Sequence, residues 1–167
     1  EDVEKFTEWL NDFETTDYLG RSGILTTLDG EKKYLEQNSS QEASFVIVTI
    51  KDNKMIGTVS LENINHINRC ATLGIFIGNK EFRSKGYGTE AIKLILEYGF
   101  KYLNLHSIKL DLLSANKRAH KCYLKCGFKD TGSSREEIYL NGKYYDKLHM
   151  DILENEFEGG CIKNKNI

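Results

Sequence analysis

The chain has 167 residues, 40% of them hydrophobic and 29% charged, which is typical of a single soluble globular domain. Its 23 basic and 25 acidic residues give a net charge of −2, so no overall positive field favours nucleic acid or anionic lipid. The longest uninterrupted apolar run, Phe45 to Val48, is far too short to cross a bilayer, and no signal-peptide pattern opens the chain. The spacing of the four cysteines matches no zinc site or disulfide framework, so we expect no bound metal and a reducing, cytoplasmic location.

The first half of the chain combines short helices with strands. Apolar residues three and four apart indicate the helices, and β-branched and aromatic runs between polar turns indicate the strands. The predicted elements are helices at 2–11 and from 28 onward, then strands at 44–51, 54–61 and 70–77. Asp29 is the expected N-cap of the second helix, Tyr34 and Leu35 are expected to point inward, and 20–27 reads as a loop.

The second half alternates strands with helices. The pattern predicts a well-buried helix at 89–103, a strand at 107–113, a helix at 117–125 that ends at Gly127, and a hairpin at 138–153 around Asn141-Gly142. A polar tail, 154–167, follows and is expected to be loose. The strand–helix–strand unit at 71–113 should cross over right-handedly with parallel strands, which indicates a mixed α/β sheet.

The segment from Arg83 to Gly88, Arg-Ser-Lys-Gly-Tyr-Gly, stands between a strand and a helix start and is suited to hold an anion. Backbone N–H groups at a helix N-terminus lack intrahelical partners, and the helix dipole adds partial positive charge there. Glycines at 86 and 88 allow a phosphate to approach the backbone, while Arg83 and Lys85 add charge. A glycine-containing turn with solvated basic residues is the competing interpretation.

Two nucleotide-binding motifs fit this segment less well. A Walker A loop requires a Lys after its last glycine, which Gly88-Thr89 lacks. The run from Gly86 to Ala91 matches the Rossmann fingerprint, with Asp111 as the ribose-binding acid. However, eight residues separate the strand from Gly86, the next strand continues past Asp111, and only 54 residues follow Leu113. That is too few for a second mononucleotide-binding half.

The loop instead resembles the GNAT superfamily of N-acetyltransferases, whose signature Gln/Arg-x-x-Gly-x-Gly/Ala is matched by Arg83, Gly86 and Gly88. The second signature of the superfamily, Asn-x-x-Ala-x-x-x-Tyr-x-x-x-Gly-Phe, is matched from Asn116 to Phe128. The hairpin at 141–146 and Met150 resemble the branch that acetylates N-terminal alanines of ribosomal proteins. The polyamine-acetylating branch is similar there and around 65–69. The resemblance covers roughly residues 2–153, although the strand that usually precedes the first helix is missing.

This resemblance implies acetyl-CoA as co-substrate and an amine that attacks the thioester directly. The donor-binding positions that it implies are Ile75, Phe76 and Ile77 for the pantetheine arm, Arg83, Ser84, Lys85, Gly86, Tyr87 and Gly88 for the pyrophosphate, and Asn116 for the arm near the thioester. A backbone N–H near Phe76 or Ile77 is the expected oxyanion donor. Plain core packing for the strand and helix capping by Asn116 are structural interpretations that remain compatible with these roles.

Two catalytic side chains follow from the same resemblance. Tyr123 occupies the position of the usual general acid, and its alternative is a core aromatic. Asp111 lies where some relatives carry a catalytic Glu, so it is a candidate base. The alternative is that Asp111 is an ordinary outward-facing strand residue. Glu62 and Glu137 are the other candidate bases. We assign no catalytic role to the histidines. An acyl-cysteine route through Cys122 is disfavoured, because one helical step should turn it away from the thioester.

The sequence therefore predicts one GNAT domain at 1–153, with a mostly antiparallel mixed sheet, one splayed parallel pair and about four helices, followed by a tail at 154–167. The expected function is acetylation of a primary amine, either a protein N-terminal Ala or Ser or a small amine. A polyamine acetyltransferase and a non-catalytic CoA-binding sensor remain alternatives. We expect no nucleic-acid or membrane partner, and a homodimer is plausible. Five acidic residues are candidates for attracting a cationic amine, with a solvated surface as the favoured alternative: Asp29, Glu31, Glu62, Glu136 and Glu137.

Overall fold

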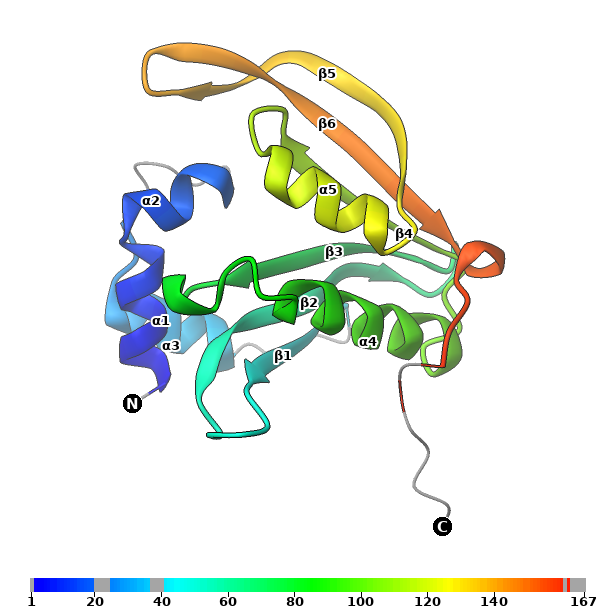
Figure 1. The fold of residues 1–167 in the computed structure, drawn as a ribbon, viewed down its shortest axis with the longest axis horizontal. Helices are drawn as coiled ribbons and strands as arrows, with labels where there is room; N and C mark the ends of the chain where they lie inside the picture. The colour runs from blue at the N-terminus through cyan, green and yellow to red at the C-terminus, as the bar shows by residue number, and fades with distance from the viewer. Residues whose placement is uncertain (1, 20–24, 37–40, 161, 163–167) are drawn as a thin grey trace.

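The computed structural model describes residues 2–19, 25–36, 41–160 and 162 (Figure 1). Six strands form one sheet in the order β1-β2-β3-β4-β6-β5. The strands are β1 (Ala43–Val48), β2 (Met55–Asn65), β3 (Cys70–Ile77), β4 (Ser107–Leu113), β5 (Lys129–Leu140) and β6 (Lys143–Leu153). The α-helices are α1 (Asp2–Leu10), α2 (Phe13–Thr16), α3 (Leu28–Glu36), α4 (Tyr87–Lys101) and α5 (Lys117–Lys125), and three short 3-10 turns are η1 (Asp17–Leu19), η2 (Lys80–Phe82) and η3 (Glu154–Glu156).

Strands β3, β4 and β6 and helix α5 have the bounds that the sequence predicts, and the Asn141-Gly142 turn has the positive φ angles of a tight hairpin. Helix α4 begins at Tyr87, two residues earlier than expected, and α2 was not predicted because four residues carry no periodic signal. Thr27, not Asp29, caps α3, since its hydroxyl accepts the Gly30 N–H at 3.1 Å. The predictions for the side chains of Tyr34 and Leu35 and for 20–24 lie outside the described residues.

The sheet opens between β3 and β4. These two strands run parallel, as predicted, but they pair only over Cys70–Thr72 and Ser107–Lys109. β4 is then held along its full length by β6, whereas β3 stays paired with β2. The two halves of the sheet therefore diverge toward the ends of β3 and β4, where α1 and α2 lie (Figure 1).

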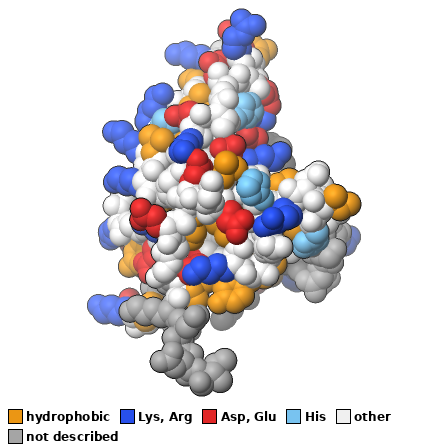
Figure 2. All heavy atoms as spheres, turned by 90° about the vertical axis from the view of Figure 1, so that its right-hand side faces the viewer, with side chains coloured by type: hydrophobic (Ala, Val, Ile, Leu, Met, Phe, Trp, Pro, Cys, Tyr) orange, Lys and Arg blue, Asp and Glu red, His pale blue; other side chains and the backbone are white. Residues whose placement is uncertain are grey.

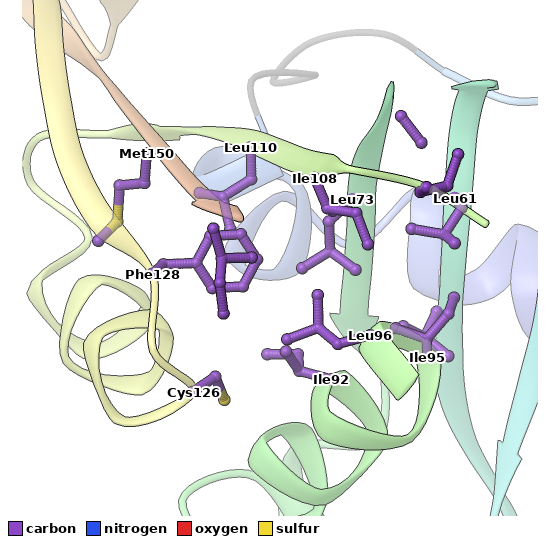
Figure 3. Packing of buried hydrophobic residues seen from close by; sticks show 14 of the residues in the cluster. Leu61, Leu73, Ile92, Ile95, Leu96, Ile108, Leu110, Cys126, Phe128 and Met150 are labelled. Carbon is purple, nitrogen blue, oxygen red and sulfur yellow. The ribbon is translucent and has the colours of Figure 1, made fainter. Parts of the chain in front are cut away.

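The two faces of the sheet differ in character. Alternate residues of β2, β3, β4 and β6 pack with α4 in one buried cluster, of which Leu61, Leu73, Ile108, Leu110 and Met150 are labelled in Figure 3. Phe128, which follows α5, belongs to the same cluster (Figure 3). The alternating positions, which include Asp111 and His149, consequently face the opposite side. In the described part of the chain, no helix is long and apolar enough to cross a membrane.

The described part of the C-terminal tail packs against α4 rather than hanging loose. Phe157 contacts the Phe100 ring, with 5.6 Å between the centroids. The fully buried carboxylate of Glu97 accepts hydrogen bonds from the backbone N–H groups of Gly160 and Ile162 at 3.3 and 2.7 Å. The expectation of a loose tail is therefore wrong for these residues, because a buried carboxylate on α4 needs donors that the tail supplies.

Candidate active site

A cleft of about 1210 Å³ lies where β3 and β4 diverge. Its wall includes ten of the twelve residues that the sequence suggests: Ile75, Phe76, Ile77, Arg83, Ser84, Gly86, Gly88, Asp111, Asn116 and Tyr123. Lys85 and Tyr87 do not line the cleft. The Tyr87 ring and the Lys85 ammonium group both contact the Phe82 ring instead. Because Asp111 faces the side of the sheet away from α4, the cleft reaches both faces through the gap between the strands.

The loop before α4 offers unsatisfied backbone donors to this cleft. Ser84 and Gly86 both have left-handed backbone conformations, with φ of 61° and 92°. The first helical hydrogen bond of α4 runs from the Glu90 N–H to the Gly86 carbonyl, so the N–H groups of residues 86–89 precede it. Turns of this kind form concave anion-binding sites from successive amides. The sequence predicts both residues as phosphate-binding positions, but no motif marks the left-handed conformation of Ser84.

Gly88 lines the cleft, and a Cβ built there would meet no atom within 4 Å. Its backbone angles are helical, so neither packing nor strain within the protein requires glycine at this position. The space above its amide is open toward the cleft, as a site for a close-approaching phosphate would be.

Arg83 has a different position from the one expected. Its Nε donates to the Ile77 carbonyl at 2.9 Å, and its Nη2 donates to Thr15 Oγ1 at 2.7 Å and to the Gly78 carbonyl at 3.2 Å. Three of the five guanidinium N–H donors are thus engaged by the protein, which disfavours a bidentate pairing of Arg83 with a phosphate. The side chain instead ties the end of β3 to α2. The backbone N–H of Arg83 donates to the Lys80 carbonyl and is therefore not available to a ligand in the cleft.

Asn116 and Tyr123 lie on α5 at the other wall of the cleft. The Asn116 side-chain oxygen accepts the Ala119 N–H at 3.1 Å, so it caps α5 and leaves its amide N–H₂ for a ligand. Tyr123 packs edge-on against Phe128, at 5.9 Å between centroids. Burial, with the neighbouring thiols of Cys122 and Cys126, raises the pKa of Tyr123 to about 12. The phenol therefore remains protonated across the physiological range and acts as a donor.

Cys122 also lines the cleft beside Tyr123, so the expected separation of these two side chains is not observed. Its Sγ lies 3.2 Å from the Thr89 hydroxyl. A hydrogen bond from the Cys126 thiol, with the one from Thr89 and the charges of Lys125 and Arg118, lowers the pKa of Cys122 to about 6. A thiolate of this kind is nucleophilic, although two neighbouring groups already hydrogen-bond it.

Charged side chains of both signs line the cleft. Arg118, Lys121 and Lys125 line it from one face of α5, three and four residues apart, next to the amide-rich loop. Four carboxylates also line it, those of Glu14, Glu31, Glu62 and Asp111, and Glu14 is paired with Lys80 at 2.7 Å. Acidic and basic side chains are interspersed on the outer face shown in Figure 2. We call Arg118, Lys121 and Lys125 the basic stripe; their spacing of three and four residues is a sequence signal that would place them on one face of a helix.

Of the suggested acceptor-side acids, Glu31 and Glu62 line the cleft, while Asp29, Glu136 and Glu137 do not. The Glu62 carboxylate accepts from the Ser60 hydroxyl at 2.7 Å. The carboxylate of Asp111, on β4, is hydrogen-bonded to His149 Nδ1 at 2.7 Å. A histidine beside the candidate base was missed because 38 residues separate the two in sequence.

The profile of the acetyltransferase (GNAT) domain matches residues 1–129. The chain belongs to the GNAT acetyltransferase family. Among curated proteins, it is 37% identical to a spermidine N(1)-acetyltransferase of Vibrio cholerae over 125 residues, which are 75% of this chain and 70% of that protein. It is 28% identical to a putative ribosomal N-acetyltransferase of Bacillus subtilis over 131 residues, which are 78% and 68% of the two chains.

Among solved structures, the GNAT fold of this chain is similar to that of spermidine N-acetyltransferase from Vibrio cholerae in complex with CoA and spermine. The TM-score is 0.86 at 30% identity, covering 93% of this chain and 91% of the other. The predicted single-domain GNAT fold is thereby confirmed, with five α-helices among the described residues rather than about four. This GNAT protein is an acyltransferase acting on amines with acetyl-CoA as donor, and the amide-lined loop and basic stripe fit the phosphates of that donor.

Proposed function

We propose that this GNAT protein transfers the acetyl group of acetyl-CoA to a primary amine of a polyamine. The observation that carries the proposal is the set of four carboxylates in the wall of the cleft, those of Glu14, Glu31, Glu62 and Asp111. A polyamine presents several ammonium groups along a flexible chain, and clustered carboxylates raise the local concentration of such a cation. The similarity to spermidine acetyltransferases supports the same acceptor.

The donor is held, in this proposal, by the amides of residues 86–89 and by the free edge of β3. Once deprotonated, the amine nitrogen attacks the thioester carbon with its lone pair, and a tetrahedral intermediate forms. A backbone N–H near Phe76 stabilises its oxyanion. The carbon–sulfur bond then breaks, and CoA leaves as a thiolate.

Tyr123 donates a hydrogen bond to that thiolate. A phenol with a pKa of about 12 holds its proton more tightly than a thiol near 8.5 does, so stabilisation by the hydrogen bond precedes any full proton transfer. Asp111, on the acceptor side of the cleft, takes the proton of the amine. An alkylammonium near 10.4 needs this help more than an α-ammonium near 8 does.

The test is an acceptor panel that monitors release of the CoA thiol from acetyl-CoA. We expect kcat/KM for spermidine and spermine to exceed that for peptides with N-terminal Ala or Ser by at least about tenfold, since several carboxylates bind the polycation. Glu62→Gln should raise KM for spermidine more than KM for a monoamine. Equal use of monoamines and polyamines would contradict the proposal.

Acetylation of the N-termini of ribosomal proteins is the second candidate. It is favoured by the hairpin sequence at 141–146 and by the similarity to the putative ribosomal enzyme. A preference for Ala or Ser peptides in the same panel would select it. If calorimetry shows CoA binding but no acceptor causes release of the CoA thiol from acetyl-CoA, the protein is the non-catalytic sensor.

A further inference from the structure

Three neighbouring strands bring a chain of hydrogen-bonding side chains to the acceptor side of the cleft. Asp111 on β4 is the register partner of His149 on β6, and Asp111 Oδ1 lies 2.7 Å from His149 Nδ1. His149 Nε2 lies 2.8 Å from the hydroxyl oxygen of Ser134 on β5. The ion pair with Lys147 lowers the pKa of the Glu137 carboxyl, and a hydrogen bond with the Ser134 hydroxyl lowers it further.

Of these side chains, Asp111 and Lys147 line the cleft, whereas His149, Ser134 and Glu137 do not. The order Ser–His–Asp is that of hydrolase triads, but here Asp111 is the member at the reacting groups and Ser134 is the most remote. Ser134 is therefore placed to orient the imidazole rather than to attack a thioester.

We propose that His149 is a positioning residue for Asp111: it engages Oδ1, so that Oδ2 is the oxygen that takes the proton of the acceptor amine. The proposal rests on the proposed amine acetylation. In the step concerned, an N–H bond of the ammonium breaks, its electron pair stays on nitrogen for attack, and an O–H bond forms at Asp111 Oδ2. The proton then passes to water, which reaches the half-exposed carboxylate.

The hydrogen-bond geometry defines which form of His149 is active. In the neutral form, Nδ1–H donates to Asp111 and the Ser134 hydroxyl donates to Nε2. In the imidazolium form, Nε2–H donates to Ser134, whose hydroxyl turns to Glu137. Both forms satisfy every donor, so one proton can be gained without unfolding the network. The two forms of His149 therefore differ in the charge that they present to Asp111.

The charged groups that face His149 come from all three strands. They are Asp111 and Lys109 on β4, Lys147 and Asp151 on β6, and Glu137 on β5. Lys109 and Asp151 are register partners and Lys147 pairs with Glu137, so Asp111 is the one carboxylate among these five groups whose cross-strand partner is the imidazole itself.

The experiment compares three variants of the intact protein. The amide N–H₂ of His149→Asn can replace the Nδ1–H donor but cannot titrate, whereas His149→Leu removes the donor. His120→Asn is the matched control, because His120 forms the same kind of pair with Asp130, at 2.8 Å, outside the cleft wall. kcat, both KM values and the pH dependence of kcat/KM are measured with spermidine.

We expect His149→Leu to lower kcat about 10- to 100-fold with KM for acetyl-CoA unchanged. His149→Asn should retain kcat within about threefold and lose one titration from the acidic limb of the profile. His120→Asn should change nothing. A wild-type kcat and pH profile in His149→Leu would overturn the proposal, as would equal losses in the Asn and Leu variants.

A second readout separates this inference from the proposed function. Nitrogen-15 NMR of the wild-type imidazole should show the neutral Nδ1–H tautomer, and Asp111→Asn should shift the ring toward Nε2–H. If wild-type protein acetylates no amine, the proposed function fails while the tautomer still reports on the pair. A wild-type ring in the Nε2–H form would overturn the positioning role whatever the activity.

Discussion

Replacing Gly88 with Ala should make the protein more stable and bind CoA more weakly. The residue sits in the first turn of α4 with helical backbone angles, and its Cβ would meet no protein atom within 4 Å. Ala is favoured over Gly in helices by up to about 1 kcal/mol, so the melting temperature should rise by about 1–4 °C. The added methyl group occupies the space above the amide that is proposed to bind phosphate. Losing one hydrogen bond to a charged group costs about 1.5–3 kcal/mol, which corresponds to about 10- to 100-fold in Kd.

Thermal unfolding and calorimetric titration with CoA measure the two effects. Gly99→Ala is the matched control on the same helix, because its Cβ would lie 2.9 Å from Ile108 Cδ1 and 3.0 Å from Leu61 Cδ1. Overpacking there should destabilise the fold by about 1–3 kcal/mol without changing CoA affinity. A Gly88→Ala protein that binds CoA with wild-type affinity would refute the assignment of the phosphate site to this loop.

Three further changes test other parts of the structure. Tyr123→Phe should lower kcat at least about tenfold and leave acetyl-CoA affinity unchanged, because only the donor to the leaving thiolate is lost; unchanged turnover would reject that role. Glu97→Ala should lower stability by about 1–3 kcal/mol and expose the tail to proteolysis, because the N–H groups of Gly160 and Ile162 lose their acceptor; an intact, protected tail would contradict this. Alkylation of Cys122 by iodoacetamide should reach half its maximal rate near pH 6 rather than 8.5, since its thiolate is stabilised above that pH, and CoA should protect it. Cys122→Ala should retain turnover within about threefold, whereas loss of activity would favour an acyl-cysteine route.

Local sequence patterns predicted much of the fold. The bounds of β3, β4 and α5 follow from runs of apolar residues punctuated by Gly, Asn and Asp, and the Asn141-Gly142 turn follows from backbone conformations that few other residues adopt. The predictions that failed concern ends and tails. Thr27 replaced Asp29 as the cap of α3, and the tail docked on α4, because both depend on which donors and acceptors the folded chain brings together.

The candidate site divides in the same way. The sequence by itself located the loop that we propose to bind phosphate and the α5 residues Asn116 and Tyr123, which all line the cleft, because their spacing within one turn or one helix is a local property. Only the tertiary structure engaged the Arg83 guanidinium with β3 and α2, turned Cys122 into the cleft and set His149 beside Asp111. Those outcomes depend on strand register and on which segments distant in the chain become neighbours, and no local spacing encodes them.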